Sequence, residues 1–139
     1  MVIRFWVVVA VVALSYTIWS HLRRRARRAA IRAGGQEQAL LLHLRLSQSQ
    51  AGDEASTIVA LEEAIESALR KHRAGEFEGH DLRDGVWTLY LYGPDAQRIF
   101  ESVAEAVRGT RLDPSSHAIL RFGERGAREE RIPLGPPAF

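Results

Sequence analysis

The sequence predicts an α+β protein in which an N-terminal transmembrane helix precedes a ferredoxin-like β-α-β-β-α-β domain with an extra C-terminal strand. Three patterns support this prediction. An uncharged apolar run opens the chain and is followed by a cluster of arginines. Two later segments carry apolar residues at helical spacing, and shorter alternating segments surround them. Their order is typical of two helices on one face of an antiparallel sheet.

The first 22 residues are expected to form the membrane anchor. Residues 5–20 carry no charge, and two more apolar residues precede Arg4, which can extend its side chain to the headgroups. Trp6 and Trp19 lie near the two ends, as interfacial aromatic residues do. A cleaved signal peptide fits less well because the basic residues follow the apolar run. A buried core helix also fits less well, because the run has no polar face.

Residues 23–35 form a basic juxtamembrane segment that ends in a Gly34-Gly35 hinge. Positive residues near a span stay in the cytoplasm, so we expect the N-terminus outside and the C-terminal domain inside, with the protein in the inner membrane. The cluster could also bind anionic lipid, at about 1 kcal/mol per basic residue. Its arginines are Arg23, Arg24, Arg25, Arg27, Arg28 and Arg32.

Charge is divided unequally between the two parts of the chain. Residues 1–35 have seven arginines and no acid, a charge of +7. Residues 36–139 have twelve basic and seventeen acidic residues, a charge of −5, which gives the net +2. A folded domain of this sign argues against nucleic-acid binding. The chain has no cysteine, which excludes disulfides, thiolate metal sites and cysteine nucleophiles.

The domain is expected to span residues 36–134, followed by a flexible tail over 135–139. Its first helix should end at Gly75, and Asp95 is a candidate N-cap for the second. Asp84-Gly85 predicts a hairpin turn. The expected strands cover residues 40–47, 76–82, 86–92, 117–123 and 128–134, and the expected helices cover residues 55–73 and 96–108.

Two segments of the second half, Gly75–His80 and Thr88–Ala96, read GEFEGH and TLYLYGPDA. Together they resemble a group of small bacterial α/β proteins of unassigned function. The resemblance covers about the last half of the chain. It implies the fold but assigns no activity and no catalytic residue.

One face of the predicted sheet should remain uncovered by the helices. If the leucine-rich side of each strand is buried, polar side chains gather on the other side and form a partner or ligand face. Its expected members are His43, Arg45, Glu76, Glu78, His80, Thr88, Tyr90, Tyr92, His117, Ile119 and Arg121.

Glu76, Glu78 and His80 stand at a spacing of two, so in a strand they would point the same way. With His43 or His117 they could ligate zinc, iron or manganese. The same residues also suit a wet edge strand whose charges discourage edge pairing.

Tyr90 and Tyr92 could stack RNA bases, or they could stabilise the sheet through cross-strand contacts. The histidines could serve as acid–base groups in hydrolysis, although no nucleophile motif accompanies them. Neither reading assigns a catalytic residue or a cofactor.

The favoured functional expectation is a membrane-tethered cytosolic interaction or regulatory module that pairs with another protein or with a second copy. One alternative is a small-molecule-binding or metal-binding domain that uses the uncovered face, with hydrolysis as one activity it could have. Another is an immunity-type protein whose acidic domain binds a basic toxin.

Overall fold

The computed structural model describes residues 37–47 and 53–136. The order of its elements is strand, helix, two strands, helix and two strands. These are β1 (Gln38–Leu44), α2 (Glu54–His72), β2 (Glu76–Arg83), β3 (Val86–Gly93), α3 (Ala96–Arg108), β4 (His117–Arg121) and β5 (Glu129–Pro133).

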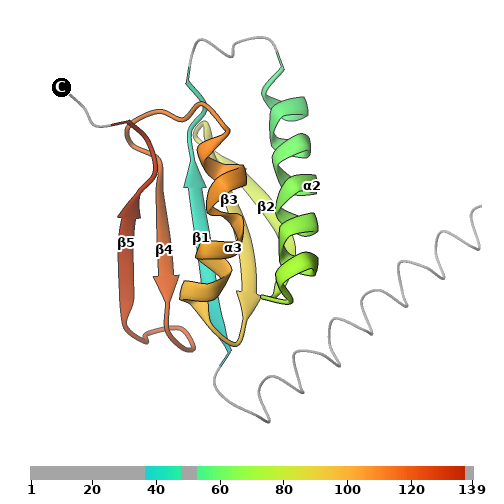
Figure 1. Ribbon diagram of the computed structural model, residues 1–139. Coiled ribbons are helices and arrows are strands. Elements are labelled where there is room, and N and C mark those ends of the chain that lie inside the picture. The colour runs from blue at the N-terminus through green and yellow to red at the C-terminus, as the bar shows by residue number, and fades with distance from the viewer. Residues whose placement is uncertain (1–36, 48–52, 137–139) are drawn as a thin grey trace, which may run out of the picture. The chain divides into compact units, whose positions relative to one another are not determined.

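The strands form one antiparallel sheet in the order β2-β3-β1-β4-β5. Both helices lie on the same side of this sheet (Figure 1). The α+β class predicted from the sequence is therefore confirmed, together with the additional C-terminal strand. The arrangement is compatible with a ferredoxin-like domain that carries β5 at the outer edge of β4.

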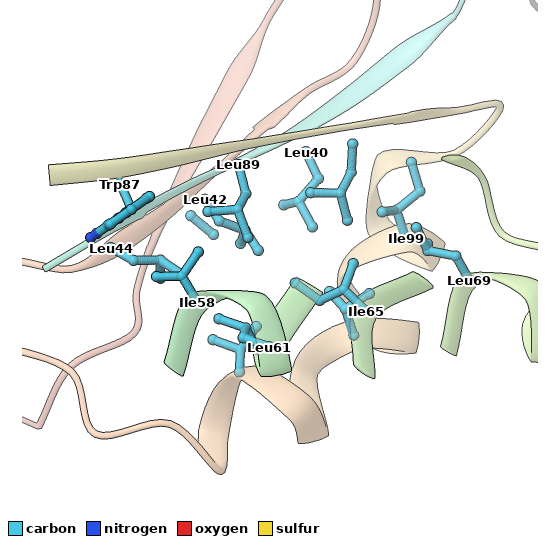
Figure 2. Packing of buried hydrophobic residues seen from close by; sticks show 14 of the residues in the cluster. Leu40, Leu42, Leu44, Ile58, Leu61, Ile65, Leu69, Trp87, Leu89 and Ile99 are labelled. Carbon is cyan, nitrogen blue, oxygen red and sulfur yellow. The ribbon is translucent and has the colours of Figure 1, made fainter. Parts of the chain in front are cut away.

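The core lies between the helices and the sheet. In β1, Leu40, Leu42 and Leu44 alternate with less buried residues and are fully buried, as expected for a strand with one covered face. Ile58 and Ile65 of α2 project toward these leucines (Figure 2). The rest of the labelled cluster is Leu61 and Leu69 of α2, Trp87 and Leu89 of β3, and Ile99 of α3.

Both helices begin at an aspartate. Asp53 accepts a hydrogen bond from the Ser56 backbone N–H at 3.1 Å, and Asp95 accepts one from Arg98 at 3.1 Å, which confirms Asp95 as an N-cap. The Gln38 side chain accepts a further bond from the Ala96 N–H at 2.8 Å. β1 therefore contributes directly to the start of α3.

The end of α2 differs from the prediction. The helix is capped by Arg73, whose left-handed backbone has φ 49°, and Ala74 N–H donates to the Leu69 carbonyl. Gly75 has another role, because a Cβ there would lie 2.3 Å from the Tyr92 carbonyl oxygen. This position needs glycine for the close approach of two chain segments, and the helix has already ended.

The predicted hairpin turn between β2 and β3 is present. Asp84 and Gly85 both have positive φ, at 53° and 75°, as a tight two-residue turn requires. Near the C-terminus, Gly135 packs against the Asp113-Pro114 loop, where a Cβ would meet the Asp113 carbonyl oxygen at 2.2 Å. The part of the expected tail at 137–139 lies outside the described residues.

In the described ranges, no helix is long and apolar enough to cross a membrane. The predicted anchor over residues 1–22 and the basic segment over 23–35 lie outside these ranges.

Replacing Leu42 with alanine should lower the free energy of unfolding by about 2–5 kcal/mol, because it opens a cavity between sheet and helices. The matched control is Val59→Ala on α2, which should change it by about 0.5 kcal/mol or less because Val59 is 50% exposed. Urea unfolding of residues 36–139 can be followed by fluorescence, since Trp87 is their single tryptophan. Equal losses of unfolding free energy in the two variants would contradict the placement of Leu42 in the core.

Candidate interaction face on the open side of the sheet

The side of the sheet opposite α2 and α3, here called the open face, is organised in three rows that run across the strands. Directly paired residues of antiparallel strands point to the same side. Each row is named after its β3 residue. The Tyr92 row is Glu76, Tyr92, Ala39, Arg121 and Glu129; the Tyr90 row is Gly79, Tyr90, Leu41, Ile119 and Arg131; the Thr88 row is Asp81, Thr88, His43, His117 and Pro133.

The middle of the open face is apolar and its two margins are charged. Leu41, Tyr90 and Ile119 lie side by side at the centre and remain partly exposed. The β2 margin contributes Glu76 and Asp81 to the rows. The β4–β5 margin contributes Arg121, Arg131, His117 and one acid, Glu129.

Two histidines stack within the Thr88 row. The rings of His43 and His117 have centroids 4.8 Å apart and planes 20° apart. His43 Nδ1 lies 3.2 Å from the Thr88 hydroxyl, which can donate to it. His117 Nδ1 lies 2.9 Å from the Ser115 carbonyl oxygen and 3.4 Å from Arg131 Nη2. The shorter distance favours a proton on His117 Nδ1, donated to the carbonyl.

The surroundings of His43 favour its neutral form. Partial burial lowers the pKa of His43 below its ordinary value of 6.5, and the nearby His117 and Arg131 lower it further. Asp81, the acid in the same row, is separated from His43 by Thr88. The His43 side of the stack is therefore polar and favours the neutral imidazole.

The structure separates the three residues that were expected to point the same way from β2. A β-bulge interrupts the pairing between Phe77 and Gly79, with Glu78 as the extra residue. Glu76 pairs with Tyr92 on the open face, whereas His80 pairs with Leu89 and so lies on the helix side. The predicted register of His80 is wrong because one inserted residue shifts the alternation of the strand.

On the helix side, His80 joins a small polar group at the margin of the core. Its Nδ1 contacts the Glu62 carboxylate of α2, and its ring meets Trp87 edge-on at 5.2 Å. Trp87 Nε1 also donates to Glu54 at 3.5 Å. These contacts connect α2 to the β2–β3 hairpin. Within the described ranges, no group of three or more His, Cys, Asp or Glu side chains could hold a metal ion.

Arg45 has a different position from the one expected. It follows β1, and its guanidinium donates to the Asp84 carbonyl at 3.1 Å, at the β2–β3 turn. Its backbone N–H donates to the buried Ser116 hydroxyl at 2.9 Å, and Ser116 donates back to the Arg45 carbonyl at 3.1 Å. Arg45 therefore joins two loops at one end of the sheet and is not a member of the three rows.

Sequence reasoning missed Arg131, which the structure places opposite Ile119 and beside His117. Alternation within the predicted last strand assigns Glu129, Arg131 and Pro133 to one side and Ile132 to the other. The sequence therefore already indicates that Arg131 and Ile132 point to opposite sides of the sheet. However, the side that faces the helices depends on the pairing with β4, which the sequence does not specify.

The free energy of unfolding should fall as the pH drops below 6.5, partly because of His43. The unfolded chain takes up a proton near that value, while the folded state resists protonation because its pKa is lower. The contribution of neutral His43 is complete above pH 6.5 and is lost as the pH falls through that value toward the folded-state pKa. His43→Asn should thus reduce the difference in urea stability between pH 7.5 and pH 5.5. An unchanged difference would contradict this assignment.

The chain was compared with protein families, curated proteins and solved structures. No family model, curated protein or solved structure matches it. The resemblance to small bacterial α/β proteins therefore stays a prediction from the two sequence segments that carry it.

Proposed function

We propose that the chain is a single-pass membrane protein with its N-terminus outside and a ferredoxin-like domain in the cytoplasm. In this proposal the domain is a protein-interaction module, and its open face binds the partner. The membrane-proximal arginines set the orientation and the Gly34-Gly35 hinge separates the domain from the bilayer.

The observation that carries the proposal is the apolar centre of the open face. Leu41, Tyr90 and Ile119 are adjacent, and no described helix or strand covers them. An apolar centre with a polar margin is the usual composition of a protein interface. Tyrosine is also enriched among residues that dominate binding, since it combines a large apolar ring with a hydroxyl.

The sheet edges are less suited to binding a partner than the face. β2 is interrupted by its bulge and carries charged side chains, and β5 ends at Pro133. Bulges, charges and proline all discourage the addition of another strand. These features favour contact through the face, where the backbone hydrogen bonds are already satisfied within the sheet.

Tethering of the domain to a membrane gives a physical reason why a small binding face can hold a partner. Confinement to a membrane raises the effective concentration of a partner in the same membrane, so modest affinity produces substantial occupancy. An acidic domain would also suit a basic toxin, but in the described residues the open face has charges of both signs. The metal alternative loses its strongest support, because His80 lies on the other side of the sheet from Glu76.

The topology can be measured with single cysteines, since the natural chain has none. In right-side-out membrane vesicles, Val2→Cys should react with a membrane-impermeant maleimide. Ser115→Cys, in the exposed loop before β4, should react only after the vesicles are opened. The reverse pattern would contradict the orientation, and extraction of the protein by alkaline carbonate would contradict the anchor.

A photo-reactive amino acid at Tyr90 of the full-length chain in membranes should produce protein adducts, because this position lies at the centre of the open face. The matched control is the same substitution at Glu101, an exposed residue of α3. Adducts are detected as mobility shifts and identified by mass spectrometry. Equal labelling at the two positions would argue against the open face as the binding surface.

A further inference from the structure

We infer that the open face binds a second copy of this chain, in a two-fold dimer whose axis runs parallel to the strands. This inference rests on the proposed function and deepens it, since it names the partner and the geometry of the contact.

Two sheets that pack face to face lie about 10 Å apart. In a symmetric dimer the two-fold axis lies in the plane between them, and the same surface is used by both copies. The strands of the sheet lie along one common line, so the two-fold axis has two simple orientations. The axis can run across the strands or along them, and these choices bring different strands of the open face together.

An axis across the strands places each strand over the same strand of the second copy. Arg131 of β5 then lies over the second copy's β5, near its Arg131. The same rotation exchanges the outer two rows, so that Glu76 of β2 faces Asp81 of the second copy. Like charges meet at both margins of this arrangement, which opposes association.

An axis along the strands instead places β2 of one copy over β5 of the other. The β2 margin then faces the β4–β5 margin. Asp81, which lies 3.6 Å from Arg83 of its own strand, is within one row of the second copy's Arg131. At the centre, Leu41 faces Leu41 and Tyr90 faces Ile119. One kind of like-charge contact remains, between Glu76 and Glu129, and the two-fold axis repeats it at both rims. The charge pattern therefore favours this orientation.

The proposed anchor favours the same axis. Rotation about an axis along the strands leaves the first residues of both β1 strands at the same end of the dimer. Both chains can then lead into one bilayer. Rotation about an axis across the strands places the two starts of β1 at opposite ends, away from a shared membrane.

The size of the face explains why tethering matters. Five strands at about 4.8 Å spacing cover about 24 Å, and the three rows extend over Ala39–His43, about 17 Å of strand. The contact area is then on the order of 400 Å² per copy, about half that of a standard interface. Such a dimer is weak in solution, and confinement to a membrane raises the fraction that pairs.

The test uses full-length chains in membranes with one introduced cysteine each. Copies that carry Tyr90→Cys and Ile119→Cys, distinguished by different tags, are produced together and treated with a thiol crosslinker of about 5 Å span. This span is shorter than the two strand spacings, about 10 Å, that separate Tyr90 of one copy from Tyr90 of the other. Crosslinks are expected between the two variants, and between two Leu41→Cys copies, whereas Tyr90→Cys alone should remain monomeric. Glu101→Cys on α3 is the control that should not crosslink.

Charge reversal provides a second measurement. Arg131→Glu in the Leu41→Cys chain should lower the crosslink yield about two- to thirtyfold, the effect of the two exposed ion pairs that the dimer axis relates. Adding Asp81→Arg in the same chain should restore the yield, because the two margins exchange sign together. Failure of the second substitution to restore the yield would overturn the pairing of β2 with β5.

The outcomes separate the inference from the proposed function. Crosslinking of Tyr90→Cys to itself would overturn the strand-parallel axis. Protein that resists carbonate extraction but forms no crosslink would overturn the dimer and leave the membrane anchor in place. Crosslinks that persist in protein released by carbonate would overturn the anchor and support the dimer.

Discussion

The structure depends on β1 and its pairing with strands on both sides. This central strand sets the register of β3 and of β4, and through them the positions of the two edge strands. Leu40, Leu42 and Leu44 bury one side of β1 against both helices. Because alternation is strict, the same register assigns Leu41 and His43 to the opposite side. The core and the open face are thus two consequences of one set of hydrogen bonds.

Several contacts maintain β1 in this position. At its start, Gln38 caps the N-terminus of α3. Beyond its end, Arg45 is hydrogen-bonded to Ser116 and to the turn between β2 and β3. A slip of β1 by one residue would expose its leucines and break these contacts at both ends together. Because the register of β1 is fixed in this way, the residues of the open face keep the same positions relative to one another.

The bulge in β2 changes the side of the sheet on which the residues after it lie. It places His80 against Glu62 and Trp87, where it strengthens the attachment of α2, and leaves Glu76 on the open face. The open face consequently has an apolar centre and two margins of different charge. Its two histidines stack, and partial burial lowers the pKa of His43. These properties favour the proposed association with a protein.

The sequence by itself determined the α+β class, the order of the elements, the hairpin turn and the buried residues of the strong strands and helices, because these depend on local periodicity and turn chemistry. It also brought Tyr90, Thr88, His43 and His117 to one face through alternation alone. Only the tertiary structure decided the strand order, the stack of His43 and His117, and the places of Arg45, Arg131 and His80. These depend on which strands pair and on one inserted residue in β2, and such long-range register leaves no periodic signal in a single sequence.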